Sequence, residues 1–67
     1  MQLGMVKWFN KTKGLGSITP MIGGNDIRVY AQDLTNHSFL QEGQRVQFTV
    51  EILPNVFIAR QVQVIPT

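Results

Sequence analysis

The residues best suited to chemistry lie in two short segments near the amino end, and the chemistry they offer is ring stacking and positive charge. The first segment is Lys7-Trp8-Phe9-Asn10, and the second is Lys13-Gly14-Leu15-Gly16-Ser17-Ile18. Exposed strands that bind unpaired bases commonly carry a basic residue followed by glycines that alternate with aromatic residues. The second segment keeps the basic residue and both glycines, but Leu15 and Ser17 stand where rings are expected. It has the outline of a nucleic-acid-binding motif with few stacking rings.

Trp8 and Phe9 are candidates both for the core and for contact with a ligand, because large aromatic side chains in small domains are usually buried. Successive side chains of a regular strand point to opposite faces, so both rings cannot point inward unless a bulge intervenes. We therefore expect at least one exposed ring beside Lys7. An exposed ring next to a cation suits an unpaired base and its phosphate.

Two further strands supply a second set of candidate contacts. Alternation along residues 15–19 and 26–31 separates an apolar inward set from an outward set. The outward set is Leu15, Ser17, Arg28 and Tyr30. It offers one aliphatic group, one hydroxyl, one guanidinium plane and one ring, so stacking capacity is present but reduced.

Residues later in the chain could extend this surface. Phe39 or His37, in a polar stretch, could supply a further ring, although a single loop histidine is more often just a polar residue. Arg60, in the last predicted strand, either adds to a basic rim or simply faces solvent. The sequence leaves both interpretations open.

Composition narrows the classes of function. Six Lys and Arg against four Asp and Glu give a net charge of +2, and the cations Lys7, Lys11 and Lys13 concentrate at the amino end. The absence of cysteine and the single histidine argue against a disulfide framework and against a thiolate or multi-histidine metal site. No nucleophile and base pair and no carboxylate dyad is recognisable. We therefore expect a binding protein without catalysis, metal or cofactor.

Several short β-type runs separated by turn residues, with no helical periodicity, predict an all-β chain. The runs are expected at about residues 3–10, 15–19, 26–31, 45–52 and 57–65, the first three forming a meander. We expect a polar connection over residues 32–43, with one helical turn near residues 31–34. Broken alternation between Ala59 and Val62 predicts a bulge. The core-facing side of the fourth run is Val46, Phe48, Val50 and Ile52.

A flat sheet made from five such strands would expose an apolar face and two long edges, whereas a barrel closes on its own apolar face. We predict a five-stranded antiparallel Greek-key barrel of the OB type, with an SH3-like barrel as the structural alternative. Residues 1–67 are expected to form a single domain. No apolar run approaches the ~20 residues that span a bilayer, and residues 1–4 do not begin a signal peptide, so a soluble cytoplasmic protein is the expectation.

From about Gly4 to Val64 the chain resembles the cold-shock domain, a bacterial family of small OB-fold proteins that bind single-stranded RNA and DNA. The Lys-Trp-Phe-Asn run within residues 4–10 is the specific part of this resemblance. Residues 13–18 and 26–30 stand in place of the two ribonucleoprotein-type motifs. Residues 41–46 with Phe48, and residues 59–62, resemble the family's fourth and last strands.

The resemblance implies that Lys7, Trp8, Phe9 and Lys13 lie on the binding face, with Tyr30 where the family usually has histidine. The family usually has phenylalanine at the positions of Leu15, Ser17, Arg28 and Ala31. Stacking on an aromatic ring is worth ~1–3 kcal/mol per base, so the resemblance also implies a weakened affinity.

The leading interpretation is a single-stranded RNA- or DNA-binding protein, acting as a cold-shock-like RNA chaperone or affecting transcription. Its candidate contacts are Lys7, Trp8, Phe9, Lys13, Leu15, Ser17, Arg28, Tyr30, Phe39 and Arg60. The alternative is a barrel that acts as a protein-interaction or self-associating module, including a homodimer formed by strand exchange. It is motivated by Leu15, Ala31 and the apolar run Val56-Phe57-Ile58, for which ordinary strand packing is the competing interpretation.

Overall fold

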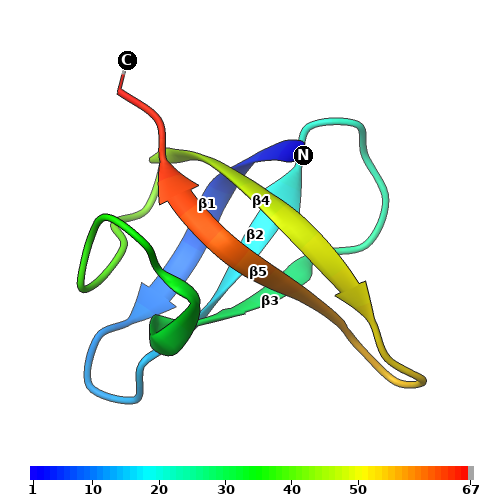
Figure 1. Cartoon of the computed structure of the whole chain (residues 1–67), viewed down its shortest axis with the longest axis horizontal. Helices are drawn as coiled ribbons and strands as arrows, with labels where there is room; N and C mark the ends of the chain where they lie inside the picture. Colours follow the sequence, from blue (N-terminus) through cyan, green and yellow to red (C-terminus); the bar gives the residue numbers. More distant parts are fainter. Residues whose placement is uncertain (67) are drawn as a thin grey trace.

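The computed structural model describes residues 1–66 and contains five β-strands and one short 3-10 helix. The strands are β1 (Gln2–Asn10), β2 (Leu15–Pro20), β3 (Ile27–Tyr30), β4 (Arg45–Ile52) and β5 (Phe57–Val64), and the helix η1 (Ala31–Asp33) follows β3 directly. The strands close into a barrel in the order β1-β2-β3-β5-β4, with β4 and β5 crossing in front of β1 and β2 in Figure 1. The predicted all-β OB-type barrel is confirmed.

The connectivity explains how so short a chain closes a barrel. β1, β2 and β3 form the predicted antiparallel meander, and β1 also pairs with β4 on its other edge. The barrel closes through a short parallel ladder between β3 and β5, in which Arg28 lies opposite Ile58 and Val29 opposite Ala59. Both edges of every strand are thus used, and β1 and β2 place the two candidate segments side by side.

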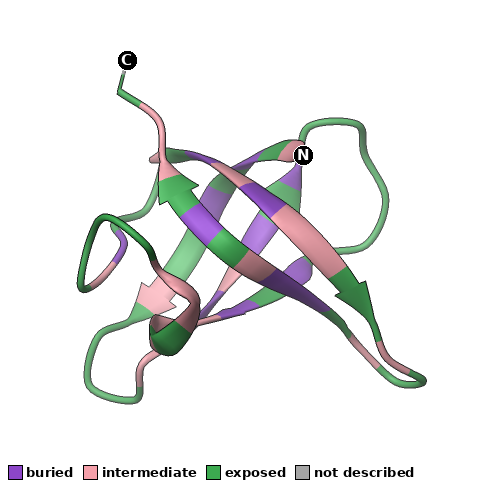
Figure 2. Ribbon diagram, viewed as in Figure 1, coloured by how far each residue is buried: buried purple, intermediate pink, exposed green. Residues whose placement is uncertain are grey.

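The core is made of inward-facing side chains from all five strands and one loop residue. Figure 2 shows buried positions alternating with exposed ones along the ribbon, and the predicted inward orientation of Ile18, Ile27 and Val29 is confirmed. The central buried cluster comprises Val6, Ile18, Ile27, Val29, Leu40, Val46, Phe48, Ala59 and Val62. Leu40 lies in the connection that was predicted only as polar, and its burial anchors that connection to the barrel.

The end of β4 departs from its predicted pattern. Val46 and Phe48 are fully buried and Val50 is half-buried, but Ile52 is 72% exposed. The prediction that Ile52 faces the core is therefore wrong. Its partner across the ladder is Phe57, at the first position of β5 and itself 40% exposed. At the mouth of the barrel Ile52 and Phe57 line one hollow together with Met1, Gln2 and Ile27.

Two glycines of the second candidate segment are required for geometric reasons. Gly14 has a φ of +68°, a left-handed conformation that residues with a Cβ adopt at a cost. A Cβ added to Gly16 would lie 2.5 Å from the carbonyl oxygen of Trp8 and 2.7 Å from Cδ1 of Phe9. Gly14 therefore permits the turn from β1 into β2, and Gly16 permits β2 to pack closely against the aromatic end of β1.

The connection between β3 and β4 is tied to β5 rather than loose. The Thr35 N–H donates to the Val62 carbonyl (2.9 Å), and the Asn36 amide bonds to both the carbonyl and the N–H of Val64 (3.2 and 3.1 Å). The helix η1 lies where a helical turn was predicted, and the predicted bulge of β5 is present at Gln61, with a φ of +52°. No helix in residues 1–66 is long and apolar enough to cross a bilayer.

Candidate nucleic-acid interface

A bulge in β1 decides which aromatic ring faces outward. The register between β1 and β2 shifts between Val6 and Trp8, so that Lys7 is the extra residue on its strand. Without this shift, strict alternation from the buried Val6 would turn Trp8 inward and Phe9 outward. The bulge reverses the orientation of both rings. Lys7 and Trp8 both lie on the outer face, Trp8 is 44% exposed, and Phe9 is half-buried against the core cluster.

The outward residues of β1, β2 and β3 form two rows across the ladders. In the first row Trp8 lies opposite Ser17, which lies opposite Arg28. The second row consists of Asn10, Leu15 and Tyr30, with Leu15 and Tyr30 half-buried and Asn10 exposed. Neighbouring strands are ~4.8 Å apart, so each row spans about 10 Å, a distance over which a nucleobase can contact more than one side chain. We call this surface the β1–β3 face.

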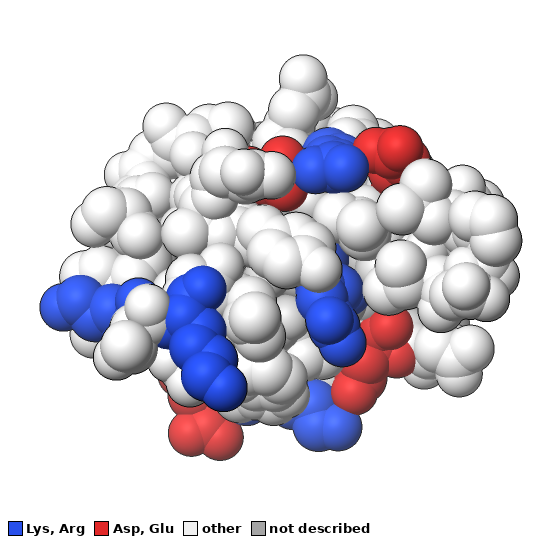
Figure 3. All heavy atoms as spheres, turned by 90° about the horizontal axis from the view of Figure 1, so that it is seen from below, with Lys and Arg blue, Asp and Glu red and all other residues white. Residues whose placement is uncertain are grey.

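The cations of the β1–β3 face differ in what they contact. Lys7 Nζ lies 2.8 Å from Asp26 Oδ2 in an exposed ion pair, and the Thr19 hydroxyl reaches the other oxygen of Asp26. Lys13 is exposed on the turn that follows β1, and its N–H, rather than its side chain, is bound by Asn10 Oδ1 at 2.9 Å. Figure 3 shows basic side chains spread over the lower face of the barrel, with acidic side chains beside several of them. An exposed ion pair of this kind contributes little to stability.

Phe39 is held by a cation that the sequence did not suggest as its partner. The Lys11 ammonium lies 4.3 Å from the centroid of the Phe39 ring, which is half-buried. This contact bridges the turn after β1 and the connection before β4, and it places Phe39 beside the turn that carries Lys13. His37 is directed toward its neighbour Asn36, with a ring nitrogen 3.0 Å from the amide oxygen. Of the two loop rings considered from sequence, Phe39 is the one that lies near the candidate segments.

Arg60 is engaged by two carboxylates. Its Nε donates to Glu51 at 2.8 Å and its Nη1 donates to Asp33 at 3.0 Å. The hydrogen bond to Glu51, together with the nearby charge of Asp33, raises the pKa of Arg60 above its usual value. The side chain thus links β5 to β4 and to η1. Its predicted place in a basic contact surface remains a prediction, and the structure gives it a clear architectural role.

The β1–β3 face presents rings and cations and is not lined by a cluster of metal-ligating side chains within residues 1–66. Within residues 1–66 no group of three metal-ligating side chains comes together, and every buried side-chain polar atom has a hydrogen-bond partner. What the face presents is one exposed indole, a phenol, a guanidinium and several ammonium groups. Rings and cations at strand spacing suit unpaired bases and their phosphates.

Alternation predicted the outward residues of β2 and β3, but it left open which ring of β1 faces outward and gave no sign of the contacts that hold the face in place. The bulge at Lys7, the Lys7–Asp26 ion pair and the Lys11–Phe39 contact depend on segments that are far apart in the chain. A register shift has no composition signal here, since no glycine marks it. The only local hint was the presence of two adjacent rings in one strand.

A small closed barrel with a ring-and-cation face of this kind defines the class of OB-type nucleic-acid-binding domains. Comparison with known proteins is consistent with that class: residues 2–65 match the family described as the 'Cold-shock' DNA-binding domain. Among similar proteins, "Cold shock protein CspV" of Vibrio cholerae is 52% identical over 50 residues, covering 72% of this chain and 71% of the relative.

Two other relatives match over their whole length. "Cold shock-like protein CspA" of Bordetella pertussis is 39% identical over 67 residues, covering 97% of this chain and 100% of the relative. "Cold shock-like protein CspA" of Stigmatella aurantiaca is 43% identical over 68 residues, covering 98% and 100%. This chain therefore belongs to the cold-shock domain family, a family of nucleic-acid-binding domains.

Proposed function

We propose that this chain binds single-stranded RNA or DNA through the β1–β3 face, without catalysis and with an affinity weakened by the shortage of rings. The observation that carries the proposal is the exposed Trp8, turned outward by the bulge at Lys7 and aligned across the ladders with Ser17 and Arg28. Membership of the cold-shock domain family supports it. An RNA-chaperone or transcription-affecting activity in the cytoplasm is the corresponding cellular proposal.

The proposed contacts divide by chemistry. Trp8, Tyr30 and Phe39 offer rings for stacking, and Phe9, mostly turned into the barrel, offers the edge that remains exposed. Lys7 and Lys13 offer charge for phosphates, and Leu15 and Ser17 offer an aliphatic and a hydroxyl contact. Arg60, held by Asp33 and Glu51, acts mainly by fixing η1 and the strands behind the face. Fewer rings leave the phosphate contacts a larger share of the binding energy.

Fluorescence of the single tryptophan tests the proposal. Titration with a short pyrimidine-rich oligonucleotide at low salt is expected to quench Trp8, because stacking on a base changes the environment of the indole. The apparent affinity should fall with salt, with a log–log slope near −2 if about three phosphates are neutralised on a single strand. An unchanged fluorescence at low salt and high protein concentration would rule the proposal out.

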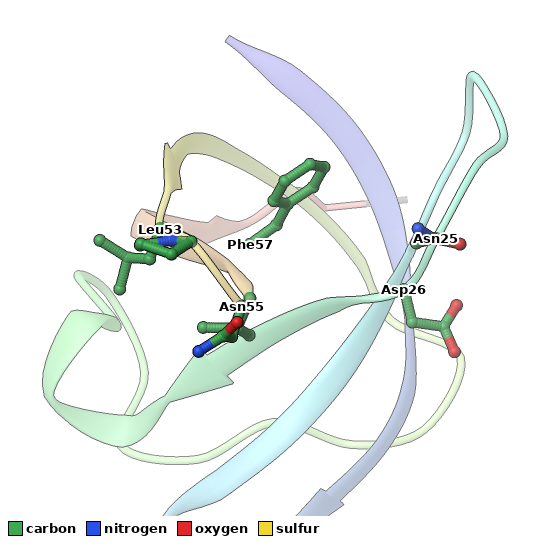
Figure 4. A pocket seen from close by; sticks show the side chains of 7 residues that line it. Asn25, Asp26, Leu53, Asn55 and Phe57 are labelled. Carbon is green, nitrogen blue, oxygen red and sulfur yellow. The ribbon is translucent and has the colours of Figure 1, made fainter.

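A second candidate function, self-association, is favoured by the apolar mouth of the barrel. Exposed Met1, Ile52 and Phe57 line one hollow there together with Ile27 and Val50. A neighbouring cleft of about 270 Å³ separates the hairpin residues Leu53 and Asn55 from Asn25 and Asp26, with Phe57 standing between them (Figure 4). Exposed apolar surface of this kind often marks a contact between proteins.

Light scattering over a range of concentrations tests this candidate. A molecular mass that rises with concentration, and returns to that of one chain in an Ile52→Lys variant, is the expected result for self-association through the barrel mouth. A constant mass of one chain at all concentrations, in a preparation that binds oligonucleotides, would exclude this second function while leaving the first in place.

A further inference from the structure

Arg28 is the one arginine of the β1–β3 face, and no carboxylate in residues 1–66 lies within ion-pair distance of it. The other cations near the strands β3 and β5 are engaged, since Lys7 is bound to Asp26 and Arg60 to Asp33 and Glu51. Arg28 is exposed at the second position of β3. Its guanidinium therefore has donors available for a ligand.

The neighbours of Arg28 on the side of β5 leave its guanidinium free to bind a ligand. Across the parallel ladder lies Ile58, which is only 7% exposed although it lies outside the central core cluster. Glu51 of β4 lies opposite Ile58 across the next ladder. One oxygen of the Glu51 carboxylate is bound by Arg60 Nε at 2.8 Å. The aliphatic stem of an arginine can lie against an apolar neighbour such as Ile58 while its guanidinium stays in water.

On its other side Arg28 faces a small residue. Ser17 lies opposite Arg28 and also opposite Trp8, so the indole and the guanidinium are separated by two ladder spacings, about 10 Å between backbones. A serine side chain leaves the space above it open. A base that lies over Ser17 would have the Trp8 ring at one end and the Arg28 donors at the other.

We propose that Arg28 makes the β1–β3 face selective for strands that contain a guanine, by donating two hydrogen bonds to O6 and N7 of that base. The inference rests on the proposed function, since it assigns a preferred base to the same face. Arginine presents only donors, in a planar fork. Guanine presents two adjacent acceptors on its O6/N7 edge, whereas adenine presents one acceptor and one donor there. Uracil has no two adjacent acceptors, and an unpaired cytosine has one such pair, O2 and N3, on its Watson–Crick edge.

The test compares hexamers of uridine with hexamers in which one central residue is guanosine, adenosine or cytidine, followed by quenching of Trp8. We expect the guanosine strand to bind about tenfold more tightly than the uridine and adenosine strands, since a bidentate contact is worth ~1–3 kcal/mol and 1.4 kcal/mol is tenfold. A cytidine strand that binds as tightly as the guanosine strand would show that the fork reads any pair of adjacent acceptors, and it would overturn the guanine preference. Replacing the guanine by 7-deazaguanine, which lacks the N7 acceptor, should abolish most of the gain. Inosine, which keeps O6 and N7, should retain it.

Two variants separate base reading from charge. Arg28→Lys keeps the positive charge but loses the fork, so it should lose the guanine preference while binding oligouridine nearly as well as the parent protein. Arg28→Met should behave in the same way with slightly weaker binding. Arg45→Met is the matched control, because Arg45 is an exposed strand arginine outside the row of Trp8, Ser17 and Arg28, and it should keep the preference. All three substitutions lie at exposed positions, so melting curves should stay close to that of the parent protein.

The outcomes distinguish this inference from the proposed function. Equal binding of all four hexamers by the parent protein would overturn the guanine inference and leave the single-strand function intact. The inference would also be overturned if Arg28→Met weakened every hexamer equally and reduced the salt slope by about 0.7, because Arg28 would then contact only a phosphate. Failure of every strand to quench Trp8 would overturn the proposed function and, with it, the guanine preference.

Discussion

The outer side of β4 and β5 and the β1–β3 face are built from strands of one barrel, yet their polar side chains behave differently. On β4 and β5, Gln47 donates to Gln63 at 2.9 Å, and Arg60 is bound by Glu51 and Asp33. On β1 to β3, Lys7 is paired with Asp26, but Trp8 and Arg28 have no such partner in residues 1–66.

Side chains that bind one another fix a barrel, whereas side chains left without partners are available to a ligand. This difference explains why Arg60 and Arg28, which lie on neighbouring strands, are expected to have different roles. Arg60 holds η1 and β4 in place, and Arg28 reaches solvent from a face that carries an exposed indole. Net charge alone, at +2, would not distinguish the two sides.

Removal of the exposed ring should give the largest effect. Trp8→Ala is expected to weaken oligonucleotide binding by ~1–3 kcal/mol, or about 5- to 150-fold, because one base loses its stacking partner. Fluorescence anisotropy of a labelled strand measures this without the tryptophan. Trp8→Phe is the control, since it keeps a ring and should keep most of the affinity. Equal affinity of Trp8→Ala and the parent protein would show that the strand binds elsewhere.

Addition of a ring should give the next largest effect, in the opposite direction. Ser17→Phe places an aromatic side chain between Trp8 and Arg28 on the outward row, and we expect roughly tenfold tighter binding of oligouridine. The guanine preference should disappear, because the ring fills the space over Ser17. Anisotropy with the uridine and guanosine hexamers measures both. Thr49→Phe, on the outer side of β4, is the matched addition that should leave binding unchanged.

Loss of a single ammonium should have a smaller effect that depends on salt. Lys13→Met is expected to weaken binding a few-fold at low salt and to reduce the log–log salt slope by about 0.7, because one phosphate contact is lost on a single strand. Titrations at several salt concentrations measure the slope. Arg45→Met, which also removes one positive charge, is the matched control. If the salt slope of Lys13→Met equals that of the parent protein, Lys13 is not among the contacts.

Disruption of the paired side should have the smallest effect on binding. Arg60→Met removes the contacts to Glu51 and Asp33, so it should lower the thermal midpoint slightly while the affinity for oligonucleotides stays within twofold of the parent value. Circular dichroism and anisotropy measure the two quantities. A loss of affinity as large as that of Trp8→Ala, without a change in stability, would place Arg60 among the direct contacts and erase the contrast between the two sides.

The sequence predicted the barrel because alternation and turn residues carry strand identity, and it predicted the outward set of β2 and β3 for the same reason. The sequence could not show whether Trp8 or Phe9 faces outward, since that orientation depends on a register shift between two strands. Ile52 was misassigned because alternation reports direction and not where a neighbouring strand ends. The partners of Lys7, Lys11 and Arg60 come from distant segments, so no local sequence pattern predicts them.

Backbone amide NMR during addition of a single-stranded hexamer tests the central contrast most directly. We expect shifts concentrated at Lys7, Trp8, Ser17, Arg28 and Tyr30, with the amides of Gln47, Thr49 and Gln63 nearly unmoved. Shifts centred on β4 and the outer side of β5, or on Ile52 and Phe57 at the barrel mouth, would contradict the account.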